Sequence, residues 1–274
     1  MIVQEILKKC QAEKKAVLAT NFYNLETLQG ILKAASIMHV PVILQLTRSS
    51  IDYMGLEQAV QMGREGLRDY GLNGWIHLDH GNSIELVQQC LDAGFDSVMI
   101  DASEKSIDEN IHITSEVVKR AKSYNANVEA ELGYIAKLGQ DQSGGFTTAE
   151  DAIRFTGETG VDALAIAIGS AHGFYKSVPK LNIERLKEIH QAVDTVLVLH
   201  GSSGIPYDMV QEAIRNGISK VNLATEIKDT FMRTLKKTLQ ETDEIDLRKV
   251  FPKATNSVTN LLCEKYKMVN TANC

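Results

Sequence analysis

The sequence predicts an α/β protein, a (β/α)8 TIM barrel that forms one domain over residues 1–274. Two observations lead to this prediction. Short apolar runs alternate with longer segments of helical periodicity, which is typical of βαβ units and a parallel sheet. Eight such pairs occur in a chain of about the length of a closed barrel, and no linker, low-complexity run or block of charge divides them.

The predicted elements follow in chain order. A first helix over residues 1–13, with Ile6, Leu7 and Cys10 on one face, is expected to close one end of the barrel. We expect the strands at residues 16–20, 41–45, 75–80, 97–102, 127–132, 163–169, 196–200 and 220–224. We expect the main helices at residues 25–38, 56–70, 83–93, 107–123, 149–159, 183–192, 207–216 and 226–240. Residues 246–274 are predicted to add a C-terminal helical extension and a polar tail.

Glycine follows three of these helices, at Gly94, Gly160 and Gly217. A left-handed residue commonly ends an α-helix, and glycine adopts that conformation without steric cost. We therefore expect positive φ at these positions, just before the next strand.

The composition excludes several classes of protein. Hydrophobic residues make up 44% of the chain and charged residues 23%, which is a globular balance. The net charge of −6 and the lack of basic blocks argue against nucleic acid, and the apolar runs are too short for a membrane span. The four cysteines form no CxxC pair, which favours free thiols and a cytoplasmic location.

Polar side chains follow nearly every predicted strand, where barrel enzymes place their active sites. Three of them are histidines that end or closely follow a strand and are followed directly by glycine: His80, His172 and His200. Three imidazoles with one open position are typical of a catalytic Zn²⁺ site. Three unrelated polar residues at strand ends are the alternative, and we favour the metal.

Carboxylates stand beside these histidines. Asp79 directly precedes His80, and its side chain fits a proton shuttle or a partner that orients a histidine. Asp101 and Glu131 end the fourth and fifth strands, where they fit ligands of a further monovalent or divalent cation, ligand-holding groups, or structural carboxylates.

The loops after the seventh and eighth strands often bind phosphate in such barrels, through backbone N–H groups and a helix N-terminus. Here the glycines allow close backbone approach and the hydroxyls can donate. The candidate residues are Gly173, Lys176, Gly201, Ser202, Ser203, Asn222, Leu223, Ala224 and Thr225. Ordinary loop glycines are the alternative.

A metal beside a phosphate pocket predicts polarisation of a ketone. A Schiff-base aldolase would instead need a lysine at a strand end. We expect no lysine at the carboxyl end of a strand, because Lys220 begins the eighth strand and is expected to face the opposite rim.

These motifs resemble the class II, zinc-dependent fructose-bisphosphate/tagatose-bisphosphate aldolase family. The resemblance extends from residues 24–27 through 77–81, 99–103, 128–133, 167–175, 197–206 and 220–226. The stretch Asn222 to Glu226 is more similar to the tagatose-bisphosphate type, since the fructose-bisphosphate type carries Asp where Ala224 stands.

The resemblance implies that one Zn²⁺ per subunit binds His80, His172 and His200, with Asp101 and Glu131 near an additional cation. It implies that Asp79 donates a proton to the aldehyde in condensation and removes the C4 hydroxyl proton in cleavage. It also implies that the phosphate loops bind dihydroxyacetone phosphate and that the protein is a homo-oligomer, a dimer or a tetramer.

The chain departs from the family in three places. The loop at residues 136–141 lacks the usual Glu, for which Asp141 is a candidate replacement; Glu104-Lys105 follows Ser103 where the family has His; and the C-terminus lacks the usual basic motif. We therefore expect a ketose 1-phosphate derivative with a distal phosphate, sulfonate (as in sulfofructose phosphate) or carboxylate. Thr47, Arg48 and Lys105 are the candidates to meet that group. The alternative is a non-catalytic metal-binding barrel that acts as a regulatory or assembly subunit.

Overall fold

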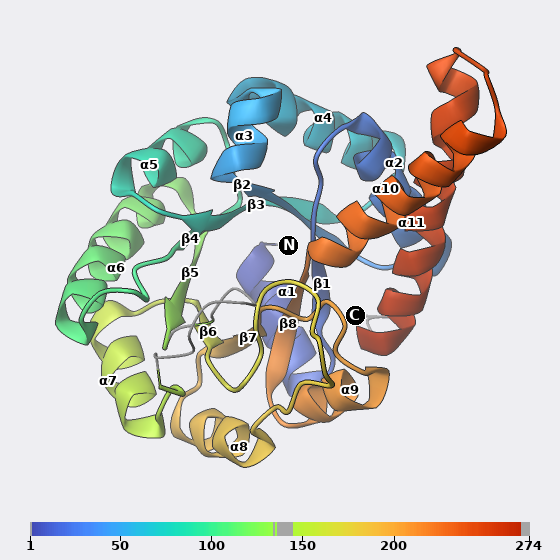
Figure 1. The fold of residues 1–274 in the computed structure, drawn as a ribbon. Helices are drawn as coiled ribbons and strands as arrows, with labels where there is room; N and C mark the ends of the chain where they lie inside the picture. The colour runs from blue at the N-terminus through green and yellow to red at the C-terminus, as the bar shows by residue number, and fades with distance from the viewer. Residues whose placement is uncertain (1, 134, 136–144, 270–274) are drawn as a thin grey trace.

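The computed structural model describes residues 2–133, 135 and 145–269. Within these residues, eight parallel strands close into a barrel in the order β1-β2-β3-β4-β5-β6-β7-β8. The helices from α2 to α9 surround the barrel as an outer ring, whereas the first helix lies across the barrel interior in this view (Figure 1). The predicted (β/α)8 fold is confirmed.

The strands are short and largely buried, as expected for a sheet that is covered by helices outside and by packed side chains inside. Their bounds are β1 Val17–Asn21, β2 Val42–Thr47, β3 Gly74–Gly81, β4 Ser97–Ile100, β5 Asn127–Leu132, β6 Ala163–Ile166, β7 Val196–Leu199 and β8 Ile218–Leu223.

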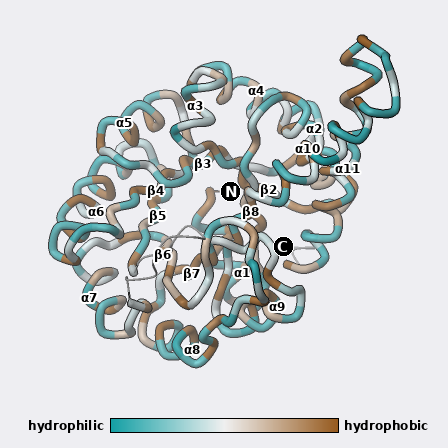
Figure 2. The backbone as a smooth tube through the Cα atoms, viewed as in Figure 1, coloured by the Kyte–Doolittle hydropathy of each residue, from teal (hydrophilic) through white to brown (hydrophobic). Residues whose placement is uncertain are grey.

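The helices of the described residues comprise the predicted set and one addition. Their bounds are α1 Val3–Glu13, α2 Leu25–Met38, α3 Arg48–Met54, α4 Leu56–Asp69, α5 Ile84–Asp92, α6 Ile107–Ala121, α7 Ala149–Thr159, α8 Ile183–Ala192, α9 Tyr207–Arg215, α10 Thr225–Glu241 and α11 Leu247–Val269, with a 3-10 turn, η1, at Lys122–Tyr124. Hydrophilic and hydrophobic segments alternate along them (Figure 2), as amphipathic packing against a barrel requires. Among the described residues, no helix combines the length and the apolar composition that a membrane span requires.

The first helix covers the amino-terminal end of the barrel. The buried side chains of α1 join the inward-facing apolar residues of the strands in one cluster, which includes Val17, Ile43 and Trp75. The carboxyl ends of the strands are thereby left as the open end, where the polar side chains gather.

Glycine ends the three helices as predicted. The φ angles of Gly94, Gly160 and Gly217 are 88°, 64° and 122°, all in the region that favours glycine. The described part of the C-terminal extension forms one helix, α11, which packs against α2 and α10.

Three predictions need correction or fall outside the structure. Helix α3 was not predicted; it begins directly after Thr47, whose hydroxyl accepts a hydrogen bond from the Ser50 amide and caps it. Strands β4 and β6 end two and three residues earlier than predicted, at Ile100 and Ile166. The altered loop at 136–141 and the C-terminus at 270–274 lie outside the described residues.

Candidate active site

Three histidines converge at the carboxyl end of the barrel. His80 is the second-last residue of β3 and has a left-handed φ of 51°, His200 directly follows β7, and His172 lies in the loop after β6. The ring centroid of His80 lies 4.9 Å from that of His172 and 4.8 Å from that of His200, and the last two are 5.9 Å apart. The strand ends thus bring together residues that are up to 120 positions apart.

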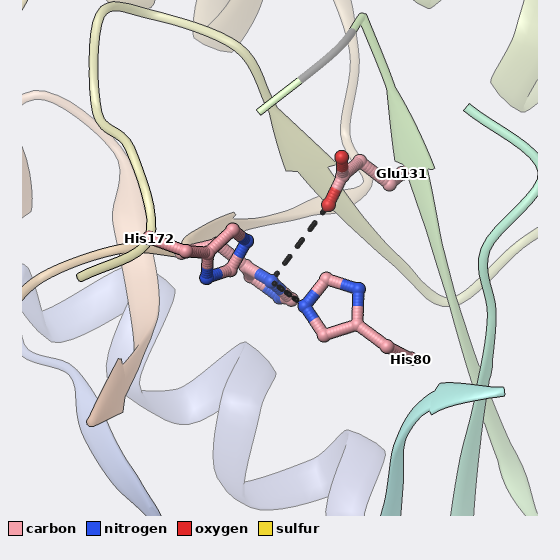
Figure 3. Close-up of side chains that lie close together, drawn as sticks. His80, Glu131 and His172 are labelled. Carbon is pink, nitrogen blue, oxygen red and sulfur yellow. Dashed lines mark hydrogen bonds and ion pairs between the residues drawn. The ribbon is translucent and has the colours of Figure 1, made fainter. Parts of the chain in front are cut away.

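Glu131, at the end of β5, completes the cluster. One ligand atom from each of His80, Glu131, His172 and His200 lies within 4.8 Å of the others. The Glu131 carboxylate is 3.8 Å from Nδ1 of His200, and Figure 3 shows it directed toward the imidazoles of His80 and His172. The family resemblance implies that Glu131 and Asp101 lie near an additional cation; in the structure Glu131 lies with the three histidines, whereas Asp101 contacts His80.

The donor set fits a divalent cation. Nε2 of His80 and Nδ1 of His200 face each other at 3.1 Å. Among the residues that the structure describes, Nε2 of His172 and Oε2 of Glu131 are buried without a hydrogen-bond partner. Buried polar atoms normally have partners, so two unpartnered atoms beside two facing imidazole nitrogens indicate a site built for an ion. Imidazole and carboxylate ligands suit Zn²⁺.

Asp101 holds His80 from behind. Its Oδ2 atom is 2.7 Å from Nδ1 of His80, and its Oδ1 atom accepts hydrogen bonds from the backbone and hydroxyl of Ser103. A carboxylate at the remote ring nitrogen of a ligating histidine fixes its orientation.

Charge and burial separate the proton affinities in this cluster. Burial and the neighbouring imidazoles lower the pKa of His172 to about 3. Burial disfavours the charged form of His80 too, but Asp79 and Asp101 outweigh it and raise its pKa to about 10. Burial and the Asp101 charge raise the pKa of Glu131 to about 8. Strongly shifted pKa values of neighbouring groups are concentrated at functional sites.

Asp79 is held beside the cluster by three amide side chains. Its Oδ2 accepts from Nδ2 of Asn21 at 2.8 Å, and its Oδ1 accepts from Gln45 and Asn222, each at 3.3 Å. Burial acts to raise the pKa of this carboxyl, but the His80 and His200 charges and the Asn21 hydrogen bond outweigh it, so the pKa lies below its ordinary value. Asp79 is therefore an ionised acceptor 3.9 Å from Nε2 of His80.

A buried ion pair lies beneath the histidines, and sequence reasoning missed it. Lys220 does not face the opposite rim: its Nζ lies inside the barrel, 2.9 Å from Glu129, whose other oxygen is 2.8 Å from Nε2 of His200. His77 of β3 bonds the Ser97 hydroxyl through Nδ1 at 2.7 Å, and its Nε2 lies 3.9 Å from the Glu129 carboxylate. The available signal was alternation within strands, which places Glu129 on the same face as Glu131.

The predicted phosphate loops lie against each other at the N-terminus of α10. Ser202 donates to the Asn222 carbonyl at 2.5 Å, and the Ser203 hydroxyl accepts from the Glu226 amide at 3.3 Å. Ala224 precedes the helix without capping it by a side chain, so Thr225 opens a helix N-terminus that suits an anion. Leu223 is buried in β8.

Tyr175 joins the loops after β6 and β7. Its hydroxyl accepts from the Ala171 amide at 2.6 Å and donates to the Gly201 carbonyl at 2.8 Å. Gly173 and Gly201 both have positive φ, 111° and 64°. Lys176, in contrast, is exposed, and the described structure gives it no contact with these loops.

The three candidates for a distal group have local partners. Thr47 caps α3, Arg48 pairs with Asp52 at 2.8 Å, and Lys105 pairs with Glu109 at 2.6 Å. Both ion pairs are exposed, so they contribute little to stability, and either side chain can readily exchange its partner.

Comparison with known proteins places these features in context. The chain matches the family described as fructose-bisphosphate aldolase class-II over residues 2–274. A fructose-bisphosphate aldolase of Helicobacter pylori strain J99 is 36% identical over 299 aligned positions, which cover 98% of this chain and 97% of the relative. The crystal structure of the YdjI aldolase from Escherichia coli K12 has a TM-score of 0.90 at 31% identity, over 99% of this chain and 97% of that one. A fructose-bisphosphate aldolase from Campylobacter jejuni shares the fold, with a TM-score of 0.84 at 21% identity over 99% and 95% of the two chains.

Proposed function

Because the chain belongs to the class-II fructose-bisphosphate aldolase family, a family of metal-dependent aldehyde-lyases, we propose that it reversibly cleaves a ketose 1-phosphate derivative to dihydroxyacetone phosphate and an aldehyde, with zinc as its metal. The observation that carries the proposal is the convergence of His80, Glu131, His172 and His200 beside the buried Asp79.

The metal would be held by His80, His172 and His200, with Glu131 in reach as a fourth ligand. A bound Zn²⁺ would act as a Lewis acid that polarises the ketone and stabilises negative charge on the dihydroxyacetone phosphate half. Asp101 would keep His80 oriented toward the ion. Because the Asp101 carboxylate is engaged with His80, Glu131 would be the carboxylate available to contact the ion directly.

Asp79 would move the proton. Its ionised carboxylate is suited to remove the C4 hydroxyl proton in cleavage and to return that proton to the aldehyde oxygen in condensation. The amides of Asn21, Gln45 and Asn222 hold the carboxylate in place, so its orientation is set before substrate arrives.

The phosphate would lie at the N-terminus of α10. Gly173, Gly201, Ser202 and Ser203 approach it from one side, and Asn222 to Thr225 lead into the helix from the other. The positive end of the helix dipole and the N–H groups of its first turn favour a dianionic group.

The distal group of the substrate is proposed to be a phosphate, sulfonate or carboxylate. Arg48 and Lys105 would meet it by exchanging their exposed partners Asp52 and Glu109, with Thr47 as a hydroxyl donor. This part of the proposal follows from the departures of the sequence from the family pattern.

A homo-oligomer in the cytoplasm is proposed as the working state of the enzyme. The described cysteines Cys90 and Cys263 are free thiols, which suits a reducing compartment. Light scattering of the purified protein tests the oligomer: a dimer or tetramer is expected, and a monomer at micromolar concentration would contradict it.

One experiment tests the function. Zinc content is measured together with dihydroxyacetone phosphate release, with and without a chelator, on fructose and tagatose 1,6-bisphosphates, sulfofructose 1-phosphate and a deoxy-ketogluconate phosphate. Chelator-sensitive release from one substrate is the expected result. Bound zinc without release from any of them would instead support the non-catalytic barrel, and free phosphate as product would indicate a hydrolase.

A further inference from the structure

The buried pair Glu129 and Lys220 has no part in the proposed chemistry, yet it occupies the centre of the barrel. Both side chains are 1% exposed, and their charged atoms lie 2.9 Å apart. A buried ion pair is weak evidence for stability, because apolar residues of similar volume often serve as well. The contacts that this pair makes toward the active site therefore need a separate explanation.

Glu129 contacts the histidine that lies deepest in the cluster. Its Oε1 atom is 2.8 Å from Nε2 of His200, and both side chains are fully enclosed. A carboxylate next to an ammonium group only accepts hydrogen bonds, so Nε2 of His200 must carry the proton. In a neutral imidazole the other nitrogen, Nδ1, is then unprotonated, and this is the atom 3.1 Å from Nε2 of His80.

Asn222 offers a competing hydrogen-bond partner for the same nitrogen of His200. Its Nδ2 is 2.9 Å from Nε2 of His200 and could donate there if that nitrogen were bare. Lys220 is a donor only, and its Nζ lies 2.7 Å from Oδ1 of Asn222, which fixes the amide with its nitrogen toward the site. That nitrogen also has an acceptor in Oδ1 of Asp79 at 3.3 Å.

We propose that Glu129 and Lys220 are positioning residues: Glu129 fixes the tautomer of His200 so that Nδ1 is presented to the metal ion, and Lys220 holds Glu129 and aims the Asn222 amide at Asp79. One buried lysine thereby links the metal-binding half of the site to its proton-transferring half. The inference rests on the proposed metal site.

The test uses two measurements on the full chain. Long-range ¹H–¹⁵N correlation spectra of the metal-free protein report which nitrogen of His200 is protonated, with His200→Gln to assign the signal. Calorimetric titration of the metal-free protein with zinc reports affinity. The variant Glu129→Met/Lys220→Met removes both charges at similar volume, which preserves a packed core.

The expected results are specific. The parent protein should show His200 protonated at Nε2, whereas the double variant should show a measurable Nδ1-protonated fraction. The double variant should bind zinc about 10- to 100-fold more weakly, the usual loss when a group behind a metal ligand is removed. The control Arg64→Met/Asp96→Asn, an ion pair at the amino-terminal end with 2.8 Å between its partners, should bind as the parent does.

A parent His200 protonated at Nδ1, or a double variant with parental zinc affinity, would overturn the inference. The spectrum of the parent protein shows which nitrogen of His200 is protonated, even if the double variant does not fold. Failure of the proposed function shows differently: the parent itself would then bind no zinc, or would bind it without cleaving any ketose phosphate.

Discussion

Nδ1 of His80 lies 2.7 Å from Oδ2 of Asp101, and this contact turns the other nitrogen of the ring toward His200. His80 adopts a left-handed backbone conformation, which is uncommon for a residue other than glycine. The backbone turn and the carboxylate together determine where the imidazole points, so Asp101 acts on the cluster without belonging to it.

The variant Asp101→Asn is predicted to weaken zinc binding by about 10- to 100-fold, because the amide is a poorer acceptor for the His80 N–H. Calorimetric titration of metal-free protein with zinc checks this. Asp162→Asn is the control, since Asp162 accepts from the Val128 amide at the other end of the barrel. Equal affinity in the two variants would show that Asp101 does not orient His80.

The variant Asp79→Asn is predicted to lower kcat by about 10²- to 10⁴-fold, the usual contribution of a positioned acid or base. Its zinc content should remain near the parental value, because Asp79 is 3.9 Å from the nearest imidazole nitrogen and bonds amides instead. The coupled dihydroxyacetone phosphate assay and metal analysis measure the two effects. A loss of zinc in parallel with activity would make Asp79 a metal ligand.

The fold could be predicted because the alternation of strands and helices is regular over the whole chain. The three histidines could be predicted as a group because each ends or follows a strand, and parallel strands end at one rim. Their convergence, with ring centroids 4.8 to 5.9 Å apart, follows from barrel closure, which no single segment encodes.

Other features could not be read from the sequence, for identifiable reasons. Lys220 was placed at the wrong rim, because a strand start is uncertain by a few residues and β8 begins at Ile218 rather than at Lys220. In a parallel barrel both faces of a strand are buried, so apolar content does not reveal that Lys220 and Glu129 face inward. Helix α3 has seven residues, too few for a clear helical period.

His77 is predicted to make stability depend on pH. Burial and the charge of Lys220 lower its pKa from 6.5 to about 3 in the folded protein. Below pH 6.5 the unfolded chain takes up a proton that the folded protein refuses, so stability falls as pH decreases from 6.5 toward 3. Between pH 7 and pH 5 this loss is about 2 kcal/mol.

The variant His77→Gln should therefore narrow the difference in the free energy of unfolding between pH 7 and pH 5 by about 2 kcal/mol. Urea unfolding of the metal-free protein at the two pH values measures it, with the parent as reference. Glutamine can still bond the Ser97 hydroxyl, which His77 contacts at 2.7 Å. An unchanged difference between the two pH values would mean that His77 is not held neutral.

Gly201 and Gly160 offer a matched pair for the phosphate loop, since both have a φ of 64°. A methyl group at Gly160 meets no atom within 4 Å, whereas one at Gly201 would overlap the carbonyl of Ala171, a residue whose own amide donates to the Tyr175 hydroxyl. Gly160→Ala should cost about 1–2 kcal/mol of stability through its backbone alone and leave KM unchanged.

Gly201→Ala should cost more stability than Gly160→Ala. It should also raise KM about tenfold or more, because the loop must move away from the bound phosphate, a change of about 1.4 kcal/mol in binding. Thermal unfolding and steady-state kinetics measure both variants. If Gly201→Ala behaved as Gly160→Ala does, the close approach of the two loops would have no role in binding the phosphate.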